Sequence, residues 1–165
     1  MKSNIVLIGL PGVGKSTAGV ILAKVTGKRF VDSDLVIQEQ TGKLLCQIIE
    51  EEGVDGFIAI ENKINAELNV SNSIIATGGS VIYGEDAMAH LKDIGTVVYL
   101  KVGFDIINKR LSDIKGRGVV LKEGQDLKAL YEERIRLYEK YADIIIDETG
   151  LSIEKTVEQI CSALK

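Results

Sequence analysis

The sequence predicts a single α/β domain built on a parallel sheet with helices on both faces. Short apolar runs alternate along the chain with stretches of helical periodicity. Strands separated by helices need right-handed crossovers, and these produce a parallel sheet that is covered on both sides. The 165 residues contain one proline and no repeats, so we expect one domain over residues 1–165. The expected strands are Ile5 to Ile8, Phe30-Val31, Ile74 to Ala76, Val97 to Leu100 and Ile144 to Ile146.

The composition argues against nucleic acids and membranes as binding partners. A net charge of −4 and scattered lysines and arginines give no basic surface, so we expect no nucleic-acid partner. The first apolar run is too short to span a bilayer and lacks a cleavage region, which predicts no membrane association. Cys46 and Cys161 lie far apart without a C-x-x-C pattern. We expect both to be reduced, buried thiols, which predicts a protein of the reducing cytoplasm.

The first strand leads into a phosphate-binding loop (P-loop). Gly9 to Ser16 matches G-x-x-x-x-G-K-[ST] in full, and a helix is expected from Thr17 to Val25. Glycines let the chain curl so that its N–H groups point at phosphate oxygens, and the helix adds its positive end. Lys15 should reach the β- and γ-phosphates, and Ser16 should bind Mg²⁺. The predicted nucleotide-binding residues here are Gly12, Val13, Gly14, Lys15, Ser16 and Thr17.

Two carboxylates follow the second strand, at the edge where a parallel sheet binds its ligands. Asp32 is the candidate for holding a water of the Mg²⁺ shell. Asp34 is the candidate for hydrogen-bonding the acceptor hydroxyl and accepting its proton. In the alternative interpretation, one of the two aspartates caps a helix that begins at Leu35.

The third strand ends in Thr77-Gly78-Gly79-Ser80, at the same edge of the sheet. Paired glycines let the backbone approach a ligand closely and offer N–H donors to an anionic group. We therefore predict that Gly78, Gly79 and Ser80 form a substrate-binding loop. A plain turn is the alternative.

An arginine lies inside the apolar stripe of the last long helical segment. Its neighbours on the stripe are Leu127, Leu130, Tyr131, Leu137, Tyr138 and Tyr141. A guanidinium on an inward face is costly unless it meets an anion, so we predict that Arg134 binds substrate or phosphate. Arg136 lies about 200° further around the helix and should point elsewhere.

Two further arginines come before that helix. Ser112 to Gln125 is rich in glycine and charge, and it is expected to be a mobile loop that acts as a lid over about residues 112–125. Arg117 in this loop is predicted to stabilise the transferring phosphoryl group, with a solvated arginine as the alternative. Arg110 either binds a ligand or covers apolar surface with its stem.

Together these residues resemble the shikimate kinases, small P-loop enzymes that move the γ-phosphate of ATP to the 3-hydroxyl of shikimate. The resemblance implies a five-stranded sheet of order 2-3-1-4-5, catalysis by Lys15, Asp34 and Arg117, and a monomer that uses Mg²⁺. It places Arg110 at the adenine and Arg134 with Asp34 on the acid. The matching residues beyond the P-loop are Asp32-Ser33-Asp34 with Leu35-Val36-Ile37, Gly42, Gly53, Phe57, Glu61, Gly78-Gly79, Arg110, Arg117, Arg134, Leu137-Tyr138 and Ala142-Asp143.

The departures from the family pattern fall mainly on the acceptor side. Ile58 stands where an arginine would grip the shikimate carboxylate, and Glu61 thereby loses an i−3 partner. The alternatives are a kinase of another hydroxylated acid or polyol, or an ATP-binding relative without catalysis. A nucleoside monophosphate kinase lacks support, because no extra arginines surround a second phosphate. The other departures are Val54 for glutamate, Ser80 for glycine, and Gly118 and Arg136 for prolines.

Overall fold

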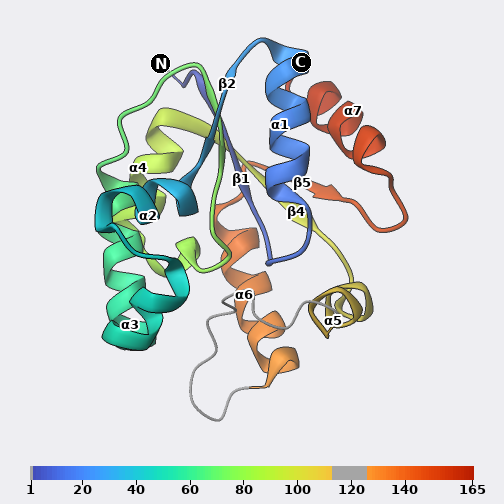
Figure 1. The fold of residues 1–165 in the computed structure, drawn as a ribbon. Coiled ribbons are helices and arrows are strands. Elements are labelled where there is room, and N and C mark those ends of the chain that lie inside the picture. Colours follow the sequence, from blue (N-terminus) through green and yellow to red (C-terminus); the bar gives the residue numbers. More distant parts are fainter. Residues whose placement is uncertain (1, 113–125) are drawn as a thin grey trace.

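The computed structural model describes residues 2–112 and 126–165. Within them the chain forms a five-stranded parallel sheet of order β2-β3-β1-β4-β5 (Figure 1), as predicted. Arg117 and all of the predicted lid after Ser112 lie outside the described residues. The strands are β1 (Asn4–Ile8), β2 (Arg29–Asp32), β3 (Ser73–Ala76), β4 (Gly95–Lys101) and β5 (Ile144–Asp147).

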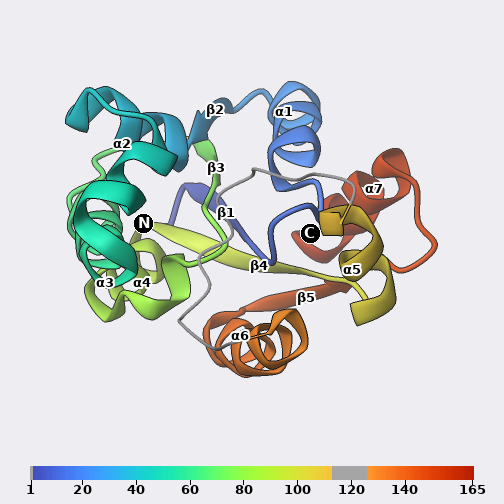
Figure 2. The same cartoon turned by 60° about the horizontal axis from the view of Figure 1, so that its bottom comes forward.

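Helices cover both faces of the sheet. One face carries α1 and α7, and the other carries α4 and α6 (Figure 2). In the described ranges, no helix is long and apolar enough to cross a membrane. The helices are α1 (Lys15–Thr26), α2 (Ser33–Thr41), α3 (Leu45–Ala66), α4 (Glu85–Ile94), α5 (Phe104–Ser112), α6 (Leu127–Tyr141) and α7 (Ile153–Ala163), with a 3₁₀ turn η1 (Val81–Tyr83).

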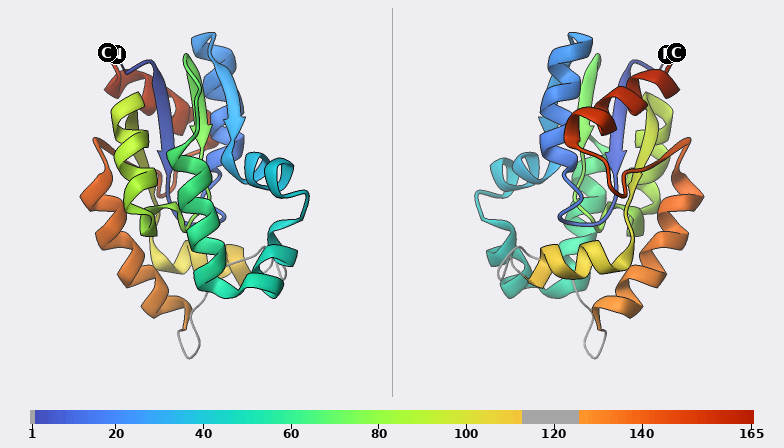
Figure 3. Two further views of the ribbon diagram at one scale, coloured as in Figure 1. Left: turned by 90° about the vertical axis from the view of Figure 1, so that its left-hand side faces the viewer. Right: turned by 90° about the vertical axis from the view of Figure 1, so that its right-hand side faces the viewer.

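The central strands are buried on both faces, which explains their unbroken apolar sequences. Every residue of β1 and β3 is buried. The register pairs Ala76 with both Leu7 and Asp32, so β1, β2 and β3 end level with one another. Every pairing in the sheet is parallel, so the strands all run in one direction, which can be followed for β1, β2 and β3 in Figure 3. The segments that follow β1, β2 and β3 therefore meet at one edge of the sheet, as the sequence predicted.

Two local expectations were wrong. The helix after β2 begins at Ser33 and not at Leu35, because the Asp32 side chain accepts a hydrogen bond of 3.0 Å from the Asp34 amide and caps it there. Cys46 is exposed and Cys161 is only partly buried, so neither is the buried thiol that was expected. Cys46 lies in the first turn of α3, a helix that packs on α2 and α4, and the neighbouring Gln47 of that turn is exposed as well.

Candidate active site

A cleft of about 730 Å³ opens at the carboxyl end of the sheet. Its walls come from the P-loop, the start of α2, the helix α3, the segment after β3, and the side chains of Arg110 and Arg134. Segments that are far apart in the sequence thus contribute to one cavity. Of the predicted site residues within the described ranges, Val13 and Asp32 alone do not line this cleft.

The P-loop places a buried ammonium group at the floor of the cleft. Gly12 and Gly14 have φ values of 83° and 91°, which residues with a Cβ rarely adopt. The Lys15 side chain is only 7% exposed, and its Nζ donates to the carbonyls of Gly9 at 2.7 Å and Leu10 at 2.8 Å. Burial lowers the pKa of Lys15 to about 8, although the negative charge of Asp34 opposes that shift. An arriving phosphate would favour the charged form.

Ser16 and Asp32 meet at the mouth of the loop. The Ser16 hydroxyl donates to Asp32 Oδ2 at 3.0 Å, while Asp32 Oδ1 caps α2. The structure therefore confirms the capping interpretation of Asp32, and its role toward Mg²⁺ stays a prediction. A hydroxyl and a carboxylate side by side next to a phosphate-binding loop are the hard oxygen donors that Mg²⁺ prefers, so these residues fit that ion.

Asp34 extends from the first turn of α2 into the cleft. Burial raises the pKa of its carboxyl group, the neighbouring charge of Asp32 raises it further, and Lys15 opposes both. A Cβ at position 78 would stand 2.7 Å from Asp34 Oδ1, so only glycine lets the segment after β3 pass this close. A partly buried carboxylate with a raised pKa is suited to accept a proton.

Arg134 enters the cleft from α6 and is 1% exposed, as the stripe of apolar neighbours predicted. Its guanidinium lies 5.5 Å from the ring centre of Tyr83. A Cβ on Gly79 would stand 2.9 Å from Arg134 Nη1, so this glycine is also required by space. Arg136 is exposed on the opposite side of the helix, which confirms that it points elsewhere.

Sequence reasoning missed the residue that holds the segment after β3 in place. Tyr138 is fully buried, and its hydroxyl donates to the Gly79 carbonyl at 2.6 Å. The signal was available, since Tyr138 lies four residues after Arg134 and therefore on the same helix face. One helix face thus supplies both a cation to the cleft and an anchor for the segment after β3.

Glu61 is the second residue whose place the sequence did not predict. The side chain is 1% exposed on α3, and its Oε1 accepts a hydrogen bond from the Ser80 hydroxyl at 2.5 Å. Burial raises the pKa of Glu61 to about 7, against the opposing effect of the Ser80 bond. Ser80 therefore contacts the acidic wall of the cleft directly, from the position where the family pattern has glycine.

Arg110 reaches the opposite side of the P-loop. Its Nη1 donates to the Gly12 carbonyl at 3.0 Å and lies 4.0 Å from Glu148 Oε1. Glu148, which follows β5, is buried, and this burial raises its pKa to about 7 while Arg110 opposes the shift. No sequence pattern singled out Glu148, because it approaches Arg110 only through the packing of β5 beside β4.

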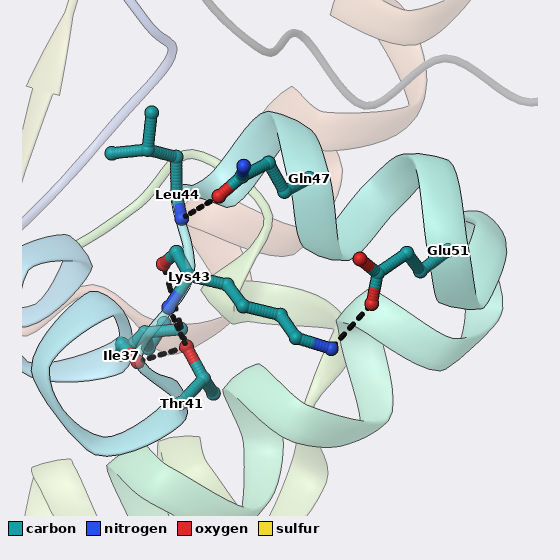
Figure 4. Close-up of polar contacts among 6 residues, drawn as sticks. All are labelled: Ile37, Thr41, Lys43, Leu44, Gln47 and Glu51. Atoms are coloured by element: carbon teal, nitrogen blue, oxygen red, sulfur yellow. Dashed lines mark hydrogen bonds and ion pairs between the residues drawn. The ribbon is translucent and has the colours of Figure 1, made fainter.

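The connection between α2 and α3 contributes to the wall of the cleft, and Figure 4 shows the polar contacts that hold this connection. The Leu44 amide donates to Gln47 Oε1 at 2.9 Å, and Thr41 Oγ1 donates to the Ile37 carbonyl at 2.7 Å. Lys43 pairs with Glu51 across the first turns of α3. These bonds fix a short turn that presents Leu44, Leu45 and Cys46 to the cleft.

Comparison with known proteins gives one consistent result. The shikimate kinase family model matches residues 11–165. A shikimate kinase of Nitrosococcus oceani is 40% identical over 161 residues, which cover 95% of this chain and 84% of that protein. A shikimate kinase of Thermodesulfovibrio yellowstonii is 37% identical over 160 residues, which cover 95% of this chain and 92% of that protein.

Solved structures agree with the sequence relatives. A shikimate kinase from Acinetobacter baumannii in complex with shikimate matches with a TM-score of 0.90 at 32% identity, over 99% of this chain and 93% of that one. A shikimate kinase from Aquifex aeolicus matches with a TM-score of 0.82, also at 32% identity, over 98% of this chain and 95% of that one. With a family model over nearly its whole length and relatives this similar, the chain belongs to the shikimate kinase family of P-loop kinases.

Proposed function

We propose that this protein transfers the γ-phosphate of ATP to a hydroxyl group of shikimate. The observation that carries the proposal is the placement of Asp34 beside Gly78 and of Arg134 beside Gly79, in the same cleft as Lys15. A protein that only binds ATP has no need of a carboxylate and a buried guanidinium next to the phosphate loop. An acceptor that carries a hydroxyl group and a carboxylate needs the protein's carboxylate for the hydroxyl group and the protein's guanidinium for the acceptor carboxylate.

In the proposed reaction, Lys15 and the amides of the P-loop hold the nucleotide phosphates. The acceptor hydroxyl loses its proton to Asp34 as its oxygen bonds to the γ-phosphorus and the bond from that phosphorus to the bridging oxygen of ADP breaks. Arg134 binds the carboxylate of the acceptor. Mg²⁺, held by Ser16 directly and by Asp32 through water, would neutralise phosphate charge when bound. Arg117 and Arg110 remain the predicted contacts to the transferring phosphate and the adenine.

The first test is Mg-ATP-dependent release of ADP by the purified protein, with shikimate varied well above the micromolar-to-millimolar range usual for KM. Saturable turnover, with shikimate 3-phosphate identified as the product, supports the proposal. Demonstrated ATP binding without turnover on shikimate contradicts it. A panel of other hydroxylated acids and of neutral polyols then separates a kinase with a different acceptor from a protein without catalytic activity.

Restoring an arginine on α3 should tighten the binding of shikimate. Ile58 is partly buried against the apolar cluster that contains Ile37 and Ile48, one turn before Glu61. Ile58→Arg adds a cation near the acceptor side, and we expect the KM for shikimate to fall by about tenfold or more. Steady-state kinetics measure the effect.

Ala59→Arg is the matched control, because it adds the same charge at the next, exposed position of the same helix. We expect its KM to stay within about twofold of the wild type, since an exposed charge is screened by solvent. An unchanged KM in Ile58→Arg would show that the acceptor carboxylate lies elsewhere in the cleft.

A further inference from the structure

Glu61 combines deep burial with an unused oxygen. Its Oε1 is bonded to Ser80, but its Oε2 is buried and has no hydrogen-bond partner among the described residues. A Cβ on Gly78 would stand 2.7 Å from this oxygen and 2.7 Å from Asp34 Oδ1, so two carboxylates flank the same glycine. Glu61 also lines the cleft. A buried, partnerless oxygen at a ligand cleft calls for an explanation.

No cation of the two packed helices α3 and α4, both of which the structure describes, forms an ion pair with Glu61. The residue one turn earlier on α3 is Ile58. From α4, which packs on α3, Asp86 bonds to Asn62 and His90 bonds to the Leu68 carbonyl, both beyond Glu61 along α3. The titratable groups that face Glu61 from the other packed elements are Lys15 of α1, Asp34 of α2, Tyr83 of η1, and Arg134 and Tyr138 of α6.

This set has a charge problem when an acid binds. With Glu61 ionised, the carboxylates of Asp34 and Glu61 already balance the positive charge of Arg134 and part of the positive charge of Lys15. The nucleotide phosphates also need the charge of Lys15. A third carboxylate, from the acceptor, would enter a partly buried site with an excess of negative charge. Carboxylates that share a site in this way do not all remain ionised. One proton relieves the excess, and Glu61 has a free oxygen to carry it.

We propose that Glu61 determines specificity for an acid acceptor: its carboxyl group, held by Ser80, takes up one proton when the acceptor binds, so that Glu61 no longer balances the positive charge of Arg134 and the carboxylate of the acceptor can do so. This inference rests on the proposed function. The ordinary pKa of a glutamate would make such uptake costly at neutral pH, but burial raises the pKa of Glu61 to about 7. The protonated form is therefore already well populated there.

The expected pH dependence follows from the sign of this shift. Below pH 7 Glu61 is mostly protonated before binding, so the affinity for the acid is high and constant. Above pH 7 the free protein must take up a proton to bind, and the affinity falls by up to about tenfold per pH unit. A neutral analogue with the same hydroxyl groups, the methyl ester of shikimate, adds no charge. Its affinity should change little between pH 6 and pH 8.

Isothermal titration calorimetry of the full chain with shikimate, without nucleotide, tests the proposal directly. Titrations at pH 6 and pH 8, in buffers with different ionisation enthalpies, count the protons taken up. We expect close to none at pH 6 and close to one at pH 8, with a Kd about tenfold higher at pH 8. Because the pKa of Lys15 is about 8, part of any uptake at pH 8 could belong to Lys15, so a variant must separate the two groups.

Glu61→Gln makes that separation. A glutamine has nearly the shape of a protonated glutamate and can keep the bond to Ser80, but it does not titrate. We expect this variant to bind shikimate at pH 8 about as tightly as the wild type does at pH 6, and to lose most of the proton uptake. Glu67→Gln, an exposed glutamate at the end of the same helix, is the matched control and should behave as the wild type.

Ser80→Ala gives an independent readout that does not require a change at Glu61. The Ser80 bond favours the ionised carboxylate, so its loss should move the pH at which shikimate binding weakens to a higher value. A residue that only maintains structure would lower affinity at every pH without moving that midpoint. If Glu61→Gln does not fold, the proton count of the wild type and the midpoint of Ser80→Ala decide the question.

The outcomes distinguish this inference from the proposed function. Shikimate binding that is independent of pH from 6 to 8, or proton uptake that persists unchanged in Glu61→Gln, overturns the role of Glu61 and leaves the kinase assignment standing. Equal pH dependence for shikimate and its methyl ester also overturns it. Absence of shikimate binding by the wild type at every pH overturns both together.

Discussion

Asp34→Asn is expected to lower kcat by about 10²–10⁴-fold, the range typical for loss of a general base, while the Kd for ATP stays nearly unchanged. Asparagine preserves the shape of the side chain beside Gly78 but cannot accept the hydroxyl proton. The Lys15 ammonium is hydrogen-bonded to the carbonyls of Gly9 and Leu10, so its position does not depend on a bond to this carboxyl group. Steady-state turnover at saturating ATP and shikimate, and ATP titration of the same preparation, measure the two quantities.

Asp55→Asn, which changes an exposed aspartate on α3, is the control and should leave both quantities unchanged. Because burial and Asp32 raise the pKa of Asp34, the wild-type rate should fall as the pH drops through that raised value and Asp34 becomes protonated. The pH–rate profile of Asp34→Asn should lack this decrease in rate at low pH. Turnover by Asp34→Asn at the wild-type rate would show that another group accepts the proton.

Arg134→Met is expected to raise the KM for shikimate by about 30-fold or more, corresponding to the roughly 2–5 kcal/mol lost when one member of a buried charge pair is removed. Methionine fills similar apolar space, but Asp34 and Glu61 then face no guanidinium on the acceptor side. Arg134→Lys keeps the charge without the planar guanidinium group, so its KM for shikimate should lie between the values of the wild type and Arg134→Met. Steady-state kinetics with shikimate varied at saturating ATP measure the effect.

Arg136→Met provides the comparison on the same helix, because this arginine is exposed and points away from the cleft. Its KM should match that of the wild type. Since Arg134 is 1% exposed, thermal unfolding of each variant separates a loss of binding from a loss of folding. If Arg134→Met folds and its KM for shikimate is unchanged, Arg134 does not bind the acceptor.

The sequence was sufficient for the fold and for the nucleotide side of the cleft. The Gly9 to Ser16 motif is contiguous, and its backbone conformation is encoded by its own glycines. Asp32, Asp34 and the Gly78-Gly79 pair each follow a recognisable strand. Because right-handed crossovers bring the carboxyl ends of parallel strands to one edge, their meeting could be predicted without coordinates. Arg134 was found because one charge stands out in an apolar helical stripe.

The acceptor side depends on contacts that no local pattern encodes. Glu61 meets Ser80 across 19 residues, and Tyr138 meets Gly79 across 59. The sequence indicated only that Glu61 had lost a partner at position 58. Three-dimensional packing provided Ser80 as its hydrogen-bond donor.

The sequence by itself thus determined which fold forms, where the P-loop lies, and which carboxylate and guanidinium enter the cleft, since short motifs and strand ends specify these features locally. Only the tertiary structure decided how the acidic residues share their charge. Burial and the distances between side chains on different elements set the pKa values of Glu61, Asp34 and Glu148, and neither quantity exists until the helices have packed on the sheet.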